Sequence, residues 1–190
     1  VDLLYDIKAL LAIKTEEKKL QLKFILDSYI PEKALSAPTR IRQILTNIVS
    51  NAIKFTEKGS VQVRVRWLGD QMADEGTLEI LVQDTGVGIK NDQAERLFQP
   101  FAQVDSSTTR LFGGTGLGLA LSQKLAQALG GNVSLESTEP GVGSTFKIQI
   151  TAKPVIFCSW INGFKSIDQG RDDSTNERVE VNADSLRGLH

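Results

Sequence analysis

Three polar residues, Asn47, Asn51 and Lys54, are spaced three or four positions apart in one segment of the chain. In a helix such steps return to the same face, so the three side chains would point the same way. Amide oxygens can complete the octahedron around a Mg²⁺ ion whose charge is balanced mostly by phosphates, and a lysine one turn away can meet those phosphates. A solvated polar face would have the same pattern, and these residues alone favour that plainer interpretation.

A second candidate site is the segment Asp84-Thr85-Gly86-Val87-Gly88, which follows an alternating apolar run. A carboxylate at the end of a strand can accept a hydrogen bond from an exocyclic amine such as that of adenine. Glycines beside it let a flat base approach the backbone. An aspartate that caps a turn is the commoner role of Asp-x-Gly in isolation, so the segment alone leaves both roles open.

The run from Gly113 to Leu119 is a third candidate, because it contains Gly-x-Gly-x-Gly ahead of an apolar periodic segment. The chain has no Gly-Lys-[Ser/Thr], which excludes a P-loop. The run neither follows a strand nor matches Gly-x-Gly-x-x-Gly, which excludes the dinucleotide fingerprint. What remains is a glycine-rich loop that opens a helix, where free N–H groups favour an anion, or an ordinary glycine turn.

The composition limits the other classes of function. The chain has 190 residues, 41% of them hydrophobic, and a net charge of -1. It lacks the basic surface typical of nucleic-acid binding, an apolar run near the roughly 20 residues of a membrane span, and the residue order of a signal peptide. The one histidine, His190, is the last residue and the one cysteine is Cys158, which excludes a Ser-His-Asp triad, a multi-histidine or multi-cysteine metal site and an intramolecular disulfide. We therefore expect a soluble, cytoplasmic chain, whose parent protein can be anchored in a membrane elsewhere.

Hydrophobic periodicity predicts the elements that position these residues. Helices are expected over 2–18, about 39–56 with Thr39 as its cap, a short stretch ending near 98, and from about 116 to Gly130-Gly131; strands are expected over 20–26, 61–67, 78–82, 133–135 and 146–150. The strands at 61–67 and 78–82 are predicted to be antiparallel neighbours. The pattern dissolves beyond Lys153, so we expect one domain over 1–152 and a linker or the edge of a following domain over 153–190.

Taken in order, five segments resemble one family, the catalytic ATP-binding domain of sensor histidine kinases. This family belongs to the superfamily of gyrase, heat-shock chaperones, histidine kinases and mismatch-repair proteins (the GHKL or Bergerat fold). The segments are an asparagine box at 40–56, a first glycine box at 84–89, a phenylalanine box at 97–101, a second glycine box at 114–119 and a final glycine element at 143–146. The resemblance covers about residues 1–152 and implies an α+β fold: a two-layer α/β sandwich with helices on one face of a mixed, mostly antiparallel sheet.

The resemblance also implies roles for individual residues. Asn51 would ligate Mg²⁺ and Asn47 would support the metal and phosphate site. Asp84 would read the adenine amine. Lys54 would contact the phosphates and Phe55 would lie near the base or ribose, with Gly86 and Gly88 shaping the base pocket. Residues 102–115 would form a lid, with Gln103 and Arg110 as phosphate contacts. The backbone of Gly114, Thr115, Gly116, Leu117, Gly118 and Leu119 would surround the phosphates, and Ile89, Phe101 and Thr145 complete the implied set.

Position 47 separates two reaction classes. Hydrolytic members of the superfamily carry a glutamate four residues before the metal asparagine, as general base for water. Here that position is Asn47, and an amide cannot take a proton at neutral pH. The resemblance therefore implies a protein-histidine kinase that transfers the γ-phosphoryl group of ATP, mainly by positioning and by charge neutralisation by Mg²⁺. An ATPase of the gyrase or chaperone type, a degenerate nucleotide sensor that regulates a partner without catalysis, and a purely structural scaffold are the alternatives.

Two departures from the family's pattern bear on its partners. The phospho-accepting histidine belongs to a dimerising helical hairpin, and the chain has no histidine before His190. We therefore expect a monomeric fragment without autophosphorylation, whose partner is the hairpin of a homodimeric parent. The stretch from Gln103 to Thr115 resembles hybrid kinases, which implies a response regulator or a fused receiver domain as second partner. Ala37 stands where the family commonly has aspartate, and we expect a loss of stability there rather than of chemistry.

Overall fold

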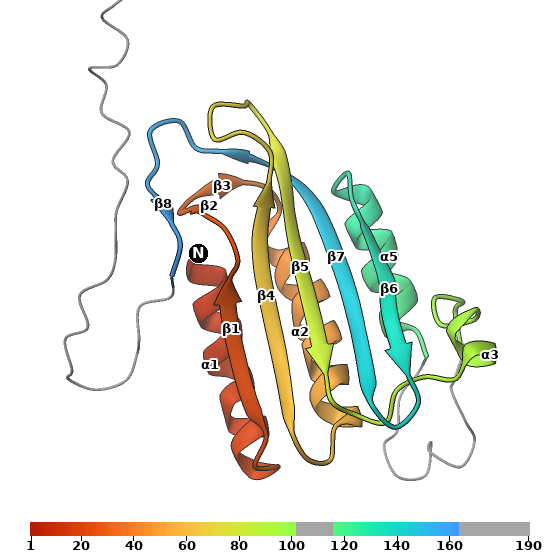
Figure 1. Cartoon of the computed structure of the whole chain (residues 1–190). Helices are drawn as coiled ribbons and strands as arrows, with labels where there is room; N and C mark the ends of the chain where they lie inside the picture. The colour runs from red at the N-terminus through yellow and green to blue at the C-terminus, as the bar shows by residue number, and fades with distance from the viewer. Residues whose placement is uncertain (102–115, 164–190) are drawn as a thin grey trace, which may run out of the picture.

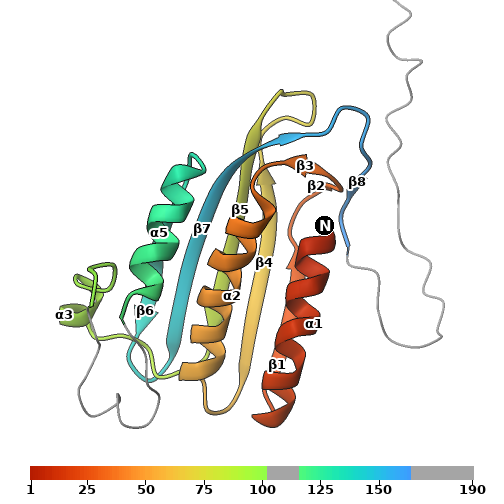
Figure 2. The same cartoon turned by 180° about the vertical axis from the view of Figure 1, so that it is seen from behind.

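The computed structural model describes residues 1–101 and 116–163 and shows the predicted two-layer α/β sandwich. One layer is a sheet with the strand order β1-β4-β5-β7-β6, in which β1 runs parallel to β4 and the other pairs are antiparallel. Its strands are β1 (Gln21–Leu26), β4 (Ser60–Leu68), β5 (Gly76–Asp84), β7 (Gly143–Pro154) and β6 (Asn132–Glu139). The helices α1 (Asp2–Glu17), α2 (Pro38–Phe55) and α5 (Gly118–Ala128) form the other layer. All three cover the same face of the sheet (Figures 1 and 2).

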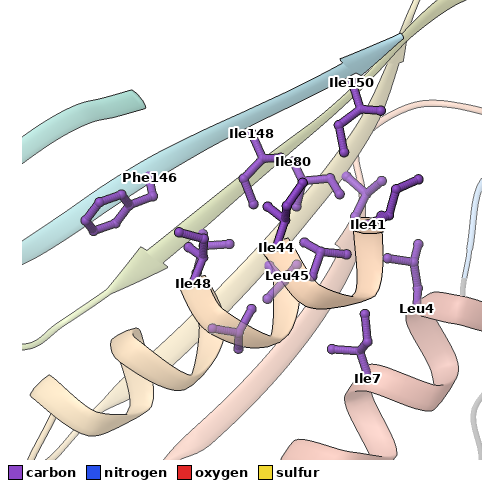
Figure 3. Packing of buried hydrophobic residues seen from close by; sticks show 14 of the residues in the cluster. Leu4, Ile7, Ile41, Ile44, Leu45, Ile48, Ile80, Phe146, Ile148 and Ile150 are labelled. Carbon is purple, nitrogen blue, oxygen red and sulfur yellow. The ribbon is translucent and has the colours of Figure 1, made fainter. Parts of the chain in front are cut away.

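The central helix, α2, owes its position to its apolar stripe. Ile44, Leu45 and Ile48 are buried against Ile80 and Ile148 of the sheet (Figure 3). The remaining buried residues of α2 are Ile41, Val49, Ala52 and Ile53. The polar stripe that includes the candidate residues is left on the other side of the helix, toward α5 and solvent.

The start of α2 differs from the prediction. The N-cap residue is Ala37, which makes no side-chain capping bond, and Pro38 occupies the first helical turn. Thr39 was expected to cap the helix but lies inside it. Proline is favoured at this position because its fixed φ suits the first turn and its missing N–H would have no partner there.

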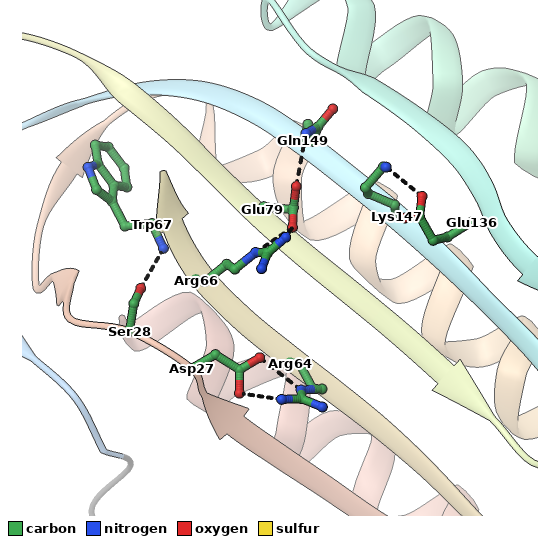
Figure 4. Close-up of polar contacts among 9 residues, drawn as sticks. All are labelled: Asp27, Ser28, Arg64, Arg66, Trp67, Glu79, Glu136, Lys147 and Gln149. Atoms are coloured by element: carbon green, nitrogen blue, oxygen red, sulfur yellow. Dashed lines mark hydrogen bonds and ion pairs between the residues drawn. The ribbon is translucent and has the colours of Figure 1, made fainter. Parts of the chain in front are cut away.

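The face of the sheet that carries no helix is held by polar pairs between strands (Figure 4). Arg64 forms an ion pair with Asp27 at 2.8 Å, and Lys147 forms one with Glu136 at 2.5 Å. Glu79 is buried among these side chains, where it accepts hydrogen bonds from Arg66 at 2.6 Å and Gln149 at 2.9 Å. A carboxylate buried in this way needs such partners, because an unpaired buried charge is costly.

Three short strands close the end of the sheet where the chain begins. β3 (Ala34–Leu35) pairs with the last residues of β7, and β2 (Ile30–Pro31) pairs with β8 (Trp160–Ile161). Trp160 is 5% exposed and packs edge-on against Trp67, with 5.8 Å between ring centroids. The ordered fold therefore continues past residue 152, where the periodicity ended.

The remaining element, α3 (Asn91–Ala94), is a single turn beyond the end of β5. Within the described part of the chain, no helix combines the length and apolar character needed to cross a membrane.

Candidate functional site

The candidate residues gather at one end of the sandwich, where α2 and β5 end and α5 begins (Figures 1 and 2). Asn47, Asn51 and Lys54 lie half-buried on one face of α2, as their spacing predicts. The Lys54 ammonium is 4.9 Å from the centre of the Phe55 ring. The last turn of α2 thus presents an amide, a cation and an aromatic ring together.

Asn47 is held by the neighbouring helix. Its Nδ2 donates a hydrogen bond of 2.8 Å to Oγ of Ser122, which is 2% exposed within α5. Gly118, the first residue of α5, comes so close that a Cβ there would lie 2.5 Å from Asn47 Oδ1. The missing side chain therefore lets the start of α5, whose first backbone N–H groups have no partner within the helix, approach the polar face of α2.

Asp84 ends β5 and is 8% exposed. Its Oδ1 accepts a 2.8 Å hydrogen bond from the N–H of Gly86. Burial raises the pKa of the Asp84 carboxyl, because it disfavours the charged form, and hydrogen bonds from the backbone of Gly86 and Ser144 oppose this rise. A buried acceptor of this kind suits a ligand that brings its own N–H donor.

The loop after Asp84 is packed as tightly as glycine allows. A Cβ on Gly86 would lie 2.4 Å from the carbonyl oxygen of Phe55, and one on Gly88 would lie 2.1 Å from that of Glu139. Gly88 also has a φ of +66°, in the left-handed region that glycine enters without steric cost. Ile89 follows, and its N–H donates to Thr138 Oγ1 at 2.9 Å. The predicted base-binding loop is thus fixed between α2 and the end of β6.

The phosphate-binding segment is described only from residue 116. Gly116 has a φ of +69°, Leu117 is exposed, and Leu119 packs partly against the core. Gln103, Arg110, Gly114 and Thr115 lie outside the described residues. Phe101, the last residue before that gap, is 73% exposed and has a φ of +63°.

Thr145 lies on a different face from Asp84. In the register of β5 and β7, Thr145 pairs with the exposed Gln83, whereas Ser144 pairs with Asp84. Ser144 is buried, and its Oγ is 2.9 Å from Thr138 Oγ1. The hydroxyl beside Asp84 is therefore that of Ser144, which our sequence analysis missed. The alternation of Phe146, Ile148 and Ile150 already indicated that position 144 shares their face.

The donor set fits a divalent cation that shares its ligand sphere with phosphates. Among residues 1–101 and 116–163, no group of three or more His, Cys, Asp or Glu side chains could hold a metal. Asn51 offers a neutral amide oxygen, which suits Mg²⁺ when ligand phosphates supply the negative charge.

Comparison with known proteins identifies a family and several relatives of this chain. A family model described as "Histidine kinase-, DNA gyrase B-, and HSP90-like ATPase" matches residues 36–154. The sensor histidine kinase GacS of Pseudomonas protegens is 43% identical over 149 residues, which are 78% of this chain and 16% of that protein. The hybrid signal transduction histidine kinase F of Dictyostelium discoideum is 38% identical over 145 residues, or 76% of this chain and 13% of that one. The chain thus spans about a seventh of the length of these relatives.

Solved structures of histidine kinase catalytic domains share the fold of this chain. Full-length ShkA in complex with AMPPNP superposes with a TM-score of 0.67 and 31% identity, covering 81% of this chain and 30% of ShkA. The nucleotide-free catalytic domain of the histidine kinase ThkA gives a TM-score of 0.61 and 25% identity, covering 81% of this chain and 94% of that domain.

Proposed function

Because the chain belongs to the family of histidine kinase-, DNA gyrase B- and HSP90-like ATPases, with sensor histidine kinases among its relatives, we propose that it binds Mg-ATP and transfers the γ-phosphoryl group to a histidine. That histidine belongs to a dimerisation hairpin outside this chain. The transfer is a step of two-component signalling, and a response regulator or a fused receiver domain takes the phosphoryl group onward.

One observation carries the proposal: the last turn of α2 and the loop after Asp84 are joined directly. The N–H of Val87 donates to the carbonyl oxygen of Phe55 at 3.2 Å. This bond ties the helix turn that carries Lys54 to the loop that follows the buried Asp84. A ligand with an amino-bearing heterocycle at one end and phosphates at the other would match an acceptor and a cation on these two segments.

The base-binding and phosphate-binding parts of the site then have different roles. Asp84 accepts the adenine amine, with Ser144 beside it, while Gly86 and Gly88 leave room for the ring. Asn51 and phosphate oxygens would hold Mg²⁺, which neutralises charge on the phosphates when bound. Lys54 contributes a further positive charge, and the start of α5 offers backbone N–H groups.

Asn47 favours phosphoryl transfer over hydrolysis. Its amide oxygen accepts hydrogen bonds but is too weak a base to take up a proton at neutral pH, and its Nδ2 is already bonded to Ser122. Water therefore meets no general base at this position, and an imidazole nucleophile needs none. The role of this chain is to hold the nucleotide while the partner hairpin supplies the nucleophile.

The test of nucleotide binding is a calorimetric titration with a non-hydrolysable ATP analogue, with and without Mg²⁺. We expect micromolar binding that Mg²⁺ strengthens, with Asn51→Ala removing the effect of Mg²⁺. Asn132→Ala, an exposed amide at the start of β6, is the control and should bind as the unsubstituted chain does. The proposal fails if the folded chain shows no binding.

Phosphoryl transfer is tested by adding a histidine-bearing hairpin from one of the related sensor kinases together with ATP. We expect an acid-labile phosphate on the hairpin and none on this chain. Release of inorganic phosphate at the same rate with and without the hairpin would identify an ATPase instead.

A further inference from the structure

We propose that Lys18 is a positioning residue for the nucleotide site. From the end of α1 it holds the last turn of α2, and with it Lys54 and Phe55, against the loop that follows Asp84. This role rests on the proposed function, because the ligand that reports it is an adenine nucleotide. The contacts of Lys18 that carry this proposal are hydrogen bonds to backbone carbonyls at the end of α2.

The first argument comes from the carbonyl groups at the end of α2. The last four carbonyls of a helix have no partner within it, and a buried end must find partners elsewhere. Lys18 Nζ donates to the carbonyl oxygens of Ile53 at 2.8 Å and Lys54 at 2.9 Å, and to that of Thr56, just past the helix, at 3.3 Å. One ammonium group thus satisfies two of the four carbonyls, and its positive charge lies at the negative end of the helix dipole.

The other two carbonyls have different partners. Ala52 accepts a 2.7 Å hydrogen bond from Thr56 Oγ1, which is local to the turn. Phe55 accepts the 3.2 Å bond from the N–H of Val87 in the base-binding loop. The final turn of α2 is therefore held on one side by α1 and on the other by the loop after Asp84.

The second argument concerns how Lys18 is aimed. The C-terminus of α1 is a Schellman motif, in which Lys19 donates to Glu16 O at 3.0 Å and Leu20 donates to Thr15 O at 2.9 Å. Lys19 has a φ of +56°, and Lys18 is the C-cap residue with helical angles. The chain then enters β1 directly, because the N–H of Gln21 donates to Gly59 O at 3.0 Å. The backbone of Lys18 is thus fixed on both sides beside the end of α2.

The third argument is that the contact between the end of α2 and the loop after Asp84 is closely packed. The carbonyl oxygen of Phe55 lies against Gly86, where even a Cβ would be only 2.4 Å away. Gly86 in turn donates its N–H to Asp84. If the last turn of α2 loosens, the Phe55 carbonyl moves, and the loop that orients Asp84 must move with it.

The experiment compares Lys18→Met, which keeps the aliphatic stem and removes the ammonium, with Lys18→Arg and with the control Lys19→Met. Lys19 is the exposed neighbour and loses the same charge. Calorimetry measures the affinity for ADP with and without Mg²⁺, and urea titration measures the free energy of unfolding of each variant. Lys18→Gln is included so that the comparison survives if Lys18→Met does not fold.

We expect Lys18→Met to weaken ADP binding about tenfold, by analogy with the lower end of the loss seen when a residue that orients a metal ligand is removed. The factor should be the same with and without Mg²⁺, because the disturbed contact is with the base-binding loop rather than with Asn51. Lys18→Arg should restore most of the affinity, Lys18→Gln should lie between, and Lys19→Met should bind normally.

The proposal is overturned if Lys18→Met, or Lys18→Gln where Met does not fold, lowers the free energy of unfolding but leaves ADP affinity unchanged. That result would make Lys18 a structural cap only. Equal weakening of ADP binding by Lys19→Met would show that the effect comes from net charge, and it would overturn the proposal as well. Absence of binding by the unsubstituted chain would instead refute the proposed function, so the two failures are distinguishable.

Discussion

Trp160 allows a sharp test of how far the folded domain extends. We expect Trp160→Ala to lower the free energy of unfolding substantially, because the side chain is 5% exposed and packs on Trp67. A buried tryptophan removes about 150–250 Å² from water, which at about 25 cal/mol per Å² amounts to about 4–6 kcal/mol. Residual burial in the unfolded chain reduces this by about 10–40%, which leaves about 2–5 kcal/mol. For a domain whose whole stability is about 5–15 kcal/mol, the loss is large.

The assay is urea unfolding followed by circular dichroism, with tryptophan fluorescence as a second probe. The chain has two tryptophans, so the emission of the variant comes from Trp67 alone and should shift to longer wavelength. Phe157→Ala is the matched control, since Phe157 is an aromatic residue in the same connection but is 92% exposed. It should change the free energy of unfolding by less than about 0.5 kcal/mol.

Nucleotide affinity should be unchanged in folded Trp160→Ala. Trp67 pairs with Leu78 on β5, and the strand from Leu78 to Asp84 spans about 20 Å at about 3.3 Å per residue. A loss of stability below about 1 kcal/mol, or an equal loss in Phe157→Ala, would refute the claim that β8 is part of the domain core.

Three further predictions concern the site and its supports. Lys19→Gly should raise the free energy of unfolding by up to about 1 kcal/mol in a urea titration, since Lys19 holds a left-handed φ of +56° that glycine adopts without strain. Gly86→Ala should lower both stability, by about 1–3 kcal/mol, and nucleotide affinity, because the new Cβ would lie 2.4 Å from Phe55 O; an unchanged calorimetric titration would contradict the packing. Burial raises the pKa of Asp84 above its usual value of 3.8. Ionising this carboxyl therefore costs more in the folded chain than in the unfolded chain, so the free energy of unfolding falls as the pH rises from 3.8 through the folded-state pKa. Asp84→Asn should therefore be the more stable protein at pH 7 with a difference that shrinks toward pH 3 in paired urea titrations, while its adenine-nucleotide affinity falls by about tenfold or more through loss of a charged acceptor.

The elements that the sequence predicted well are those whose burial follows a regular period. The apolar stripe of α2 and the alternation in β4 and β5 each repeat over several turns or residue pairs, so the pattern alone identifies the element and its buried face. The antiparallel pairing of β4 with β5 was confirmed. The polar face of α2 followed from the same geometry, because it is what remains when the apolar stripe is buried.

What the sequence could not predict depends on contacts between distant segments. β2, β3 and β8 are two residues long, too short to show any period, and Trp160 is buried only because β8 returns to pair with Ile30 and Pro31. The error over Thr39 had a local cause, since Pro38 starts the helix before a threonine cap is possible. Thr145 was named from the resemblance of 143–146 to the family's final glycine element, whereas the register of β5 and β7 pairs Ser144 with Asp84.

The positioning role of Lys18 shows why a site of this kind extends beyond its binding residues. The groups at the end of α2 to which Lys18 donates are backbone carbonyls. Every residue carries a backbone carbonyl, so no spacing or residue type in the sequence connects Lys18 with Lys54 or Phe55. The connection arises because α1 and α2 end at the same end of the fold, and because every carbonyl of a buried helix terminus must be satisfied. Since the end of α2 supports the base-binding loop through the Phe55 carbonyl, a shift of this terminus would disturb the base-binding half of the nucleotide site. A cation from α1 that fixes the terminus therefore influences nucleotide affinity without touching the nucleotide.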